Sequence, residues 1–219
     1  DADCTILGSQ FEQYFLEEIE PGLRTKVLTL PREIPGRQAG FNDRKDVVFI
    51  GGFGHLPNID AVGYFVDQIW PLAGAEMPGV KFLIAGSNMP ESIKNLESAS
   101  VKPIGFIEDL DRLFNQCRVS VAPLRFGAGI KGKIVTSLSY GVPCVATSVA
   151  AEGMNLVHGE TMLISATPGE FAQNLVKLYQ DRATWESLSD QGLDYVRQHY
   201  SLEVYQQQLT ELLAVLGLE

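Results

Sequence analysis

The strongest candidate for chemistry in this sequence is a loop rich in glycine and lysine at residues 122–134. Gly127 and Gly129 are followed by Lys131 and Lys133, and a pattern of helical period begins directly after them. Glycines allow backbone N–H groups to approach an anion closely, and the first turn of a helix carries a positive partial charge. These residue types in this order predict a site for a phosphate or a similar anion.

The distribution of charge supports the same prediction. The chain of 219 residues has 17 Lys and Arg against 27 Asp and Glu, a formal net charge of −10. Residues 112–151 nevertheless contain only basic charged residues: Arg112, Arg118, Arg125, Lys131 and Lys133. A lysine in the first turn of a helix opposes the helix dipole by roughly 0.3–1 kcal/mol. Lys131 and Lys133 are therefore unfavourable at this position unless an anion binds beside them. The alternative is a solvated basic loop whose glycines serve packing.

Two known phosphate motifs fit the loop only in part. Gly127, Gly129 and Gly132 match G-x-G-x-x-G, but the next apolar stretch ends in Thr147 and not in the acidic residue that a dinucleotide site needs. Gly132-Lys133 matches the end of a phosphate loop, but Ile134 stands where Ser or Thr would bind Mg²⁺. The sequence therefore supports an anion site without supporting either motif.

Hydrophobic patterning indicates the elements that position this loop. Apolar, β-branched stretches predict strands at 47–50, 80–85, 102–106, 119–124, 142–147 and 161–164, with patterns of helical period between them. This alternation predicts an α/β fold, a Rossmann-like parallel sheet of about six strands with helices on both faces.

The first 45 residues are expected to be a separate part of the molecule. Short strands are predicted at 4–7 and 26–30, around a helix that begins with the capping pattern Ser9-x-x-Glu12. The polar stretch 31–45 has the composition of a linker. We therefore predict that residues 1–45 are the end of an N-terminal domain and a linker. Residues 46–219 are then the Rossmann-like domain with C-terminal helices.

Composition argues against several classes of function. The acidic balance argues against nucleic-acid binding, and no apolar run approaches the roughly 20 residues of a membrane helix, so no transmembrane segment is expected.

Cys4, Cys117 and Cys144 are far apart in apolar sequence, as expected for buried thiols in a reducing compartment such as the cytoplasm. No Cys/His spacing suggests zinc, and we expect neither a metal nor another cofactor. The start at Asp1, without Met or a signal sequence, suggests a processing boundary or a piece of a longer protein.

Six sequence blocks follow one another along the chain. They are Phe49-Ile50-Gly51-Gly52 with Pro57-Asn58-Ile59-Asp60-Ala61-Val62, Phe82-Leu83-Ile84-Ala85-Gly86, Gly105-Phe106-Ile107-Glu108-Asp109-Leu110, Ala122 to Lys133, Tyr140 to Thr147, and Ala150-Ala151-Glu152-Gly153. In order and spacing these blocks resemble the C-terminal, donor-binding domain of retaining glycosyltransferases of the GT-B fold, in the group-one (family four) set. The resemblance covers nearly the whole chain.

The resemblance implies a hexosyltransferase of glycan biosynthesis, in which this chain binds a UDP-, GDP-, ADP- or TDP-sugar donor. A missing N-terminal domain would bring a sugar, lipid or protein acceptor across a cleft, in the cytoplasm or peripherally at the inner membrane face. Lys131, Lys133 and Arg125 would stabilise charge on the leaving diphosphate. The implied donor contacts are Gly51, Gly52, His55, Gly127 and Gly129 at the diphosphate, Gly105, Phe106 and Ile107 at the base, Thr136 and Ser137 near the ribose, and Glu152 at the sugar or ribose.

The sequence also departs from the family pattern. Ala128 and Thr136 stand where many members carry glutamates, and the loop after Ile50 offers only His55 where many carry a basic pair. A non-catalytic nucleotide-sugar-binding or scaffolding domain, or a sugar-nucleotide epimerase of the same fold, therefore remain as alternatives.

Several residues also have a plain structural alternative. In that interpretation Arg125 pairs with a structural carboxylate. His55 is then a solvated loop residue, and Glu152 is then a helix cap. We expect His158 and His199 at the surface and Trp70 and Trp185 in the core.

Overall fold

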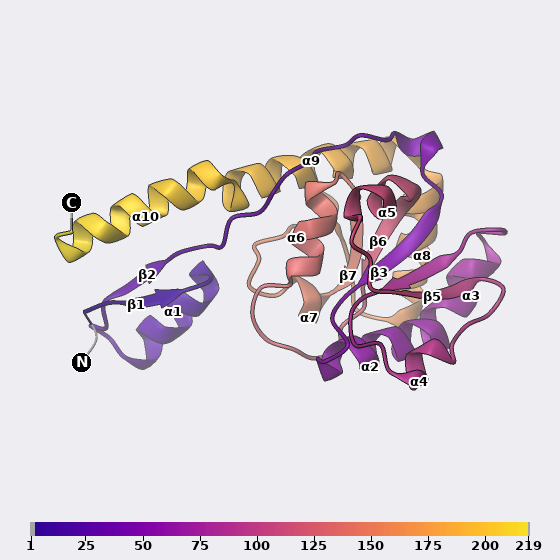
Figure 1. The fold of residues 1–219 in the computed structure, drawn as a ribbon, viewed down its shortest axis with the longest axis horizontal. Coiled ribbons are helices and arrows are strands. Elements are labelled where there is room, and N and C mark those ends of the chain that lie inside the picture. Colours follow the sequence, from indigo (N-terminus) through magenta and orange to yellow (C-terminus); the bar gives the residue numbers. More distant parts are fainter. Residues whose placement is uncertain (1–2, 219) are drawn as a thin grey trace.

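The structure, a computed structural model, describes residues 3–218. Its main body is a six-stranded, fully parallel sheet in the order β5-β4-β3-β6-β7-β8, flanked by helices (Figure 1). The strands are β3 (Asp46–Ile50), β4 (Phe82–Ala85), β5 (Val101–Gly105), β6 (Cys117–Ala122), β7 (Cys144–Thr147) and β8 (Leu163–Ser165). The predicted fold class is confirmed.

Helices cover both faces of this sheet. The helices of the main body are α2 (Leu56–Tyr64), a π-helical turn η2 (Phe65–Ile69), α3 (Trp70–Ala75), α4 (Glu91–Lys94), α5 (Leu110–Gln116), α6 (Gly132–Ser139), α7 (Ser148–Ala151), α8 (Pro168–Gln180) and α9 (Arg182–Tyr200). The last helix, α10 (Leu202–Leu216), follows α9 and extends away from the sheet (Figure 1). Alternate residues of β3 serve opposite faces: Phe49 packs in the larger core with Phe65 and Phe171, and Val48 packs with Phe114 of α5. The buried tryptophans and the exposed His158 and His199 agree with expectation.

The strand order reverses beside β3, and this reversal positions the site. From β3 the chain adds β4 and β5 on one side, and it then returns to add β6 on the other side of β3. The loops after β3 and β6 therefore diverge at the carboxyl ends of two neighbouring strands. In open parallel sheets, ligands bind in the crevice at such a switch point. The loop after β3 contains Gly51 and Gly52, and the loop after β6 is the glycine-lysine loop.

The N-terminal residues form a small unit of their own. β1 (Thr5–Leu7), α1 (Gln10–Ile19) and β2 (Thr25–Val27) make a two-stranded parallel sheet with one helix, separate from the main sheet. The predicted cap is present, because Ser9 Oγ accepts the N–H of Glu12 at 3.2 Å. Figure 1 shows α10 running from the end of α9 to this unit. There Gln208 accepts a hydrogen bond from the backbone of Thr29 at 2.8 Å.

A buried arginine fastens the linker to the main body. The linker contains the short 3-10 helix η1 (Phe41–Asp43), and Arg44 directly after it is fully buried. Its guanidinium donates to the carbonyls of Ala39, Phe114 and Tyr140 at 2.9, 3.1 and 3.0 Å. The last two carbonyls lie at the carboxyl ends of α5 and α6, where a cation is favourable. Burial lowers the pKa of Arg44 to about 10, so the side chain stays charged at neutral pH.

Candidate functional site

The structure brings the start of α2, which follows the loop after β3, into direct contact with the start of α6, which follows the loop after β6. Lys133 Nζ donates a hydrogen bond to Asn58 Oδ1, and Asn58 Nδ2 donates to the carbonyl of Gly52 at 2.7 Å. A Cβ at Gly51 would lie only 3.0 Å from the Asn58 side chain, so the small residue there leaves room for this connection. Asn58 of α2 therefore connects the start of α6 to the loop after β3, although no sequence pattern assigned it a role.

Lys133 is a largely buried cation at the start of α6. Its ammonium lies 4.6 Å from the centre of the Phe49 ring, a cation–π contact. Burial lowers its pKa to about 8, and the neighbouring charge of Lys131 acts in the same direction. No carboxylate of the described residues forms an ion pair with it. A buried, uncompensated cation at a helix N-terminus is suited to bind an anion.

Lys131 is the residue that precedes α6, and only 8% of its surface is exposed. Its ammonium donates to the carbonyls of Gly129 and Gly127, at 2.7 and 3.3 Å. Burial lowers its pKa, and the nearby charge of Glu152 partly offsets that effect. Gly127 and Gly129 have φ values of +131° and +72°, which residues with a side chain rarely adopt. The glycines therefore allow the loop to fold back over its own lysine.

Arg125 lies in the same loop but already has a partner. It forms a two-pronged ion pair with Asp60 of α2, with Nε at 2.9 Å from Oδ2, and its guanidinium lies 5.0 Å from the centre of the Tyr64 ring. The side chain is exposed. This geometry favours the structural alternative for Arg125, in which it ties the loop to α2.

A cavity of about 210 Å³ lies at the carboxyl ends of β3, β4 and β5. It gathers the predicted Gly51, Gly52, Phe106 and Ile107, and its remaining lining residues are Ile50, Ala85, Gly86, Ser87 and Leu110. The carbonyl of Gly105 accepts the N–H of Gly86 at 2.8 Å, and the Phe106 side chain is exposed. Backbone groups and apolar side chains at this place are suited to contact a flat ring.

Thr136 borders a second cavity, of about 310 Å³, which shares Leu110 with the first. Ser137 is different, because it is fully buried and its hydroxyl donates to the carbonyl of Ile134 at 3.1 Å. The side chain of Ser137 therefore does not reach the site that the sequence predicts for it. The helical pattern predicts α6 but does not settle which of two adjacent polar residues faces the ligand.

The two remaining predicted residues, His55 and Glu152, are both exposed. His55 is exposed and precedes α2 without capping it through its side chain. Glu152 is exposed directly after α7, near Lys131.

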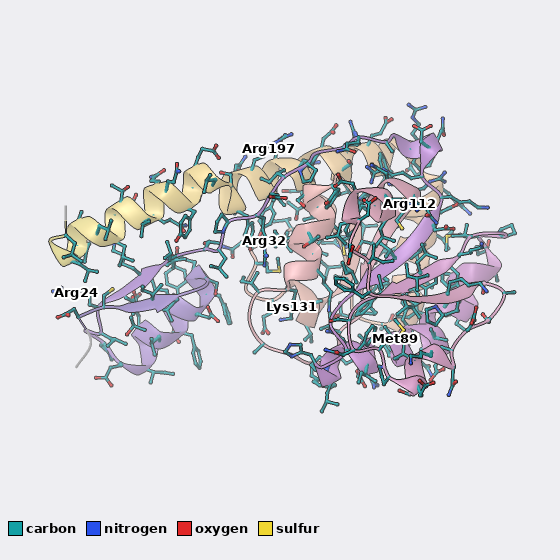
Figure 2. The ribbon with its side chains drawn as sticks, viewed as in Figure 1. Arg24, Arg32, Met89, Arg112, Lys131 and Arg197 are labelled. Atoms are coloured by element: carbon teal, nitrogen blue, oxygen red, sulfur yellow. The ribbon has the colours of Figure 1, made fainter. Side chains whose placement is uncertain are left out.

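Arg32 of the linker was not predicted to be near the site. Its guanidinium lies 3.3 Å from the position that a Cβ of Gly132 would take. Figure 2 shows Arg32 and Lys131 on the side of the main body that faces the N-terminal unit.

Two further kinds of functional feature are not found among residues 3–218. Within residues 3–218, no helix is long and apolar enough to cross a membrane. The same range contains no group of three or more His, Cys, Asp or Glu that could hold a metal ion.

Comparisons with known proteins agree with this fold. The family model described as glycosyl transferases group 1 matches residues 44–181. Among curated proteins, an uncharacterized 44.6 kDa protein in the cps region of Klebsiella pneumoniae is 22% identical over 209 residues. That match covers 89% of this chain and 54% of the relative, so the chain spans about half the length of that protein.

Two solved structures illustrate the likeness in fold. S. aureus TarM, solved as a point mutant in complex with fondaparinux, α-GlcNAc-glycerol and UDP, has a TM-score of 0.80 at 15% identity, over 96% of this chain and 43% of that one. HepE from Anabaena in complex with UDP-glucose has a TM-score of 0.75 at 18% identity, over 97% of this chain and 64% of that one. The fold is that of the GT-B glycosyltransferases. The chain belongs to the group 1 glycosyltransferases.

Proposed function

We propose that this chain binds the diphosphate of a nucleotide-sugar donor and supplies the donor half of a retaining glycosyltransferase. The observation that carries the proposal is the Lys131–Lys133 pair, two largely buried cations without an ion-pair partner among the described residues, at the switch point of the sheet. Family membership and the UDP in the TarM and HepE complexes support it.

The cavities suggest how the donor lies. The base occupies the cavity beside Gly105, Phe106 and Ile107, where backbone groups read its edge. The ribose lies toward Thr136, because Leu110 lines both the cavity for the base and the cavity beside Thr136. The diphosphate reaches the loop of Gly127 to Lys133, with Gly51, Gly52 and His55 on its other side and Glu152 near the sugar.

In this arrangement the lysines stabilise negative charge electrostatically and do not act as acids or bases. In the transfer, the bond from the sugar C1 to the diphosphate oxygen breaks, an acceptor oxygen bonds to C1, and the proton of that acceptor hydroxyl passes to the departing diphosphate. Negative charge grows on the departing diphosphate as an oxocarbenium-like sugar forms. Lys131 and Lys133 stabilise that charge electrostatically in a partly dehydrated place, where such stabilisation is strongest. The acceptor, a sugar, lipid or protein, is proposed to be positioned by chain outside this sequence, in the cytoplasm or at the inner membrane face.

A non-catalytic nucleotide-sugar-binding domain is the second candidate. Ala128 and Thr136 favour it, because neither offers a carboxylate to a sugar hydroxyl. Release of the nucleoside diphosphate from UDP-, GDP-, ADP- and TDP-hexoses, measured with the longest natural chain that contains these residues, distinguishes the two. Turnover with one donor class supports the enzyme. Binding of a donor without turnover, over a panel of acceptors, supports the second candidate.

A further inference from the structure

Asn58 of α2 carries a buried amide whose two polar atoms both have partners. Only 7% of the residue is exposed. Its Oδ1 accepts a hydrogen bond from the ammonium of Lys133, and its Nδ2 donates to the carbonyl of Gly52 at 2.7 Å. An ammonium can only donate and a carbonyl can only accept, so a flipped amide would lose both hydrogen bonds. The two contacts therefore fix one orientation of the Asn58 side chain.

The surroundings of Asn58 leave this side chain little room to move. A Cβ at Gly51 would lie 3.0 Å from Asn58 Nδ2. Asn58 is the third residue of α2, and Pro57 before it has a backbone with a restricted φ. The carbonyl of Gly52 also accepts the N–H of His55 at 3.4 Å. The amide is therefore held by the start of a helix and by the backbone of the loop after β3.

The helix α2 holds the glycine-lysine loop at two points. Arg125, before the glycines, pairs with Asp60 of α2, and Lys133, after the glycines, contacts Asn58. The stretch between these two contacts contains glycines with positive φ, and the lysine side chain is long and flexible. The contact with Asn58 selects one position of the Lys133 ammonium among the many that such a loop allows. The Asp60 carboxylate has its partner in Arg125 and is not needed by Lys133.

A neutral partner suits a cation that has to attract an anion. The Asn58 oxygen accepts from Lys133 without adding a negative charge, whereas a carboxylate there would cancel much of the field of the ammonium. The titratable groups that act on Lys133 are Lys131, a like charge, and Cys144 of β7. Burial raises the pKa of Cys144 to about 12, so its thiol is uncharged at neutral pH. The charge of Lys133 therefore stays uncompensated although its ammonium is held.

We propose that Asn58 is a positioning residue, which directs the Lys133 ammonium at the anion site and leaves its charge free to act on the ligand. Within residues 3–218 this ammonium donates no other hydrogen bond, so its remaining N–H groups are open to an anion. The inference rests on the proposed function only for the identity of that anion as a diphosphate. The coupling between Asn58 and Lys133 is a property of the chain alone.

Two variants of Asn58 test this role at nearly constant size, so the space beside Gly51 stays filled. Asn58→Leu removes both polar atoms, and Asn58→Asp puts a carboxylate in place of the amide. Asn174→Leu is the matched control, because Asn174 is a partly buried asparagine of α8 whose amide donates to Ser165 of β8 at 3.0 Å. Cooperative unfolding in urea shows that each variant is folded.

The first measurement needs no ligand. The pKa of Lys133 is followed through its side-chain NMR signals in the 219-residue chain, which are assigned by their absence from Lys133→Arg. Asn58→Asp should raise this pKa, because a carboxylate favours the ammonium, and Asn58→Leu should lower it, because the ammonium loses its acceptor. Asn174→Leu should leave it unchanged. A pKa that stays the same in both Asn58 variants overturns the inference.

The second measurement is a double-mutant cycle on the affinity of UDP at neutral pH, followed by NMR titration. Asn58→Leu should weaken UDP binding at least about fivefold in the parent chain and less than about twofold in the Lys133→Ala background, because a positioning residue has no effect once its target is absent. Asn58→Asp should also weaken binding, since the ammonium is then paired. An equal loss in both backgrounds shows that Asn58 does not act through Lys133 and overturns the inference.

The two measurements keep this inference apart from the proposed function. If the parent chain does not bind UDP while the pKa of Lys133 responds to both Asn58 variants, the proposed function fails and the positioning of Lys133 stands. If UDP binds and neither the pKa nor the cycle shows coupling, the proposed function stands and the role of Asn58 fails.

Discussion

Two lysines of one short loop have different surroundings, and this difference decides what each contributes. Lys131 donates its hydrogen bonds to the carbonyls of its own loop. It therefore holds the conformation of the loop and also gives the loop a positive charge. Lys133 connects to Asn58 across the switch point and lies over the Phe49 ring. We therefore expect Lys133 to act on the ligand mainly through its charge and its position.

Lys133→Ala should lower donor turnover by about 10²- to 10³-fold, because the charge that develops on the leaving diphosphate loses a preorganised cation. The measurement is the steady-state rate of nucleoside diphosphate release. Lys177→Ala is the matched control, since Lys177 lies on α8 outside the site and is exposed. Parental turnover by a folded Lys133→Ala variant would refute the assigned role.

The pKa of Lys133, about 8, predicts a pH dependence of diphosphate binding. The ammonium is protonated below that value and loses its proton above it, so affinity should fall as the pH rises through about 8, with UDP binding several-fold more weakly at about pH 9 than at about pH 7. Lys133→Arg should flatten this profile, because a guanidinium stays charged over the whole range. The profile comes from calorimetric titrations at each pH, and any titration of UDP itself is common to both proteins. Parallel profiles for the two proteins would show that Lys133 is not the titrating group.

Among the elements, the contact between the loops after β3 and β4 depends on one glycine. Gly86 has a φ of +155°, and a Cβ there would lie 1.8 Å from the carbonyl oxygen of Gly51. Gly86→Ala should therefore destabilise the fold by more than about 3 kcal/mol, since backbone and not a flexible side chain would have to move.

Gly63→Ala provides the contrast within the same fold. Gly63 lies in α2, and a Cβ there would meet no atom of another element within 4 Å, so alanine should stabilise by about 0.5–1 kcal/mol. Urea unfolding measures both free energies. Equal stability of the two variants would mean that the loops separate easily.

The sequence predicts the strands and helices of this fold better than it predicts the contacts between residues that lie far apart in the chain. Strands are apolar, β-branched runs, so a local pattern suffices to find them, although the predicted 80–85 shortens to Phe82–Ala85. Asn58 and Lys133 are 75 residues apart, and only the reversal of strand order brings them together. Arg32 reaches α6 from the linker, which no local pattern encodes. The glycine-lysine loop could be predicted because its glycines and lysines lie within one short stretch of the sequence.

In the molecule as a whole, the linker is held to the main body by a cation that has no ion-pair partner among the described residues. Arg44→Leu would leave the buried carbonyls of Phe114 and Tyr140 without a donor, at about 1–3 kcal/mol for each group. Part of that cost is recovered because a buried charge is removed. We expect a net loss of about 2–4 kcal/mol in the free energy of unfolding, measured with urea.

Lys45→Met is the control for Arg44→Leu, because it removes the charge of the neighbouring, exposed residue and should change stability by less than about 0.5 kcal/mol. If both variants unfold at the same urea concentration as the parent chain, the linker is not fastened by Arg44.

The central claim is that the paired lysines at the switch point bind a nucleoside diphosphate. Calorimetric titration of the 219-residue chain with UDP, GDP, ADP and TDP, beside the Lys131→Ala/Lys133→Ala variant, tests it most directly. The account predicts that one of these nucleotides binds and that the double variant loses this binding while its unfolding remains cooperative. Binding of equal strength by the double variant, or no binding of any of the four by the folded parent chain, would contradict the account.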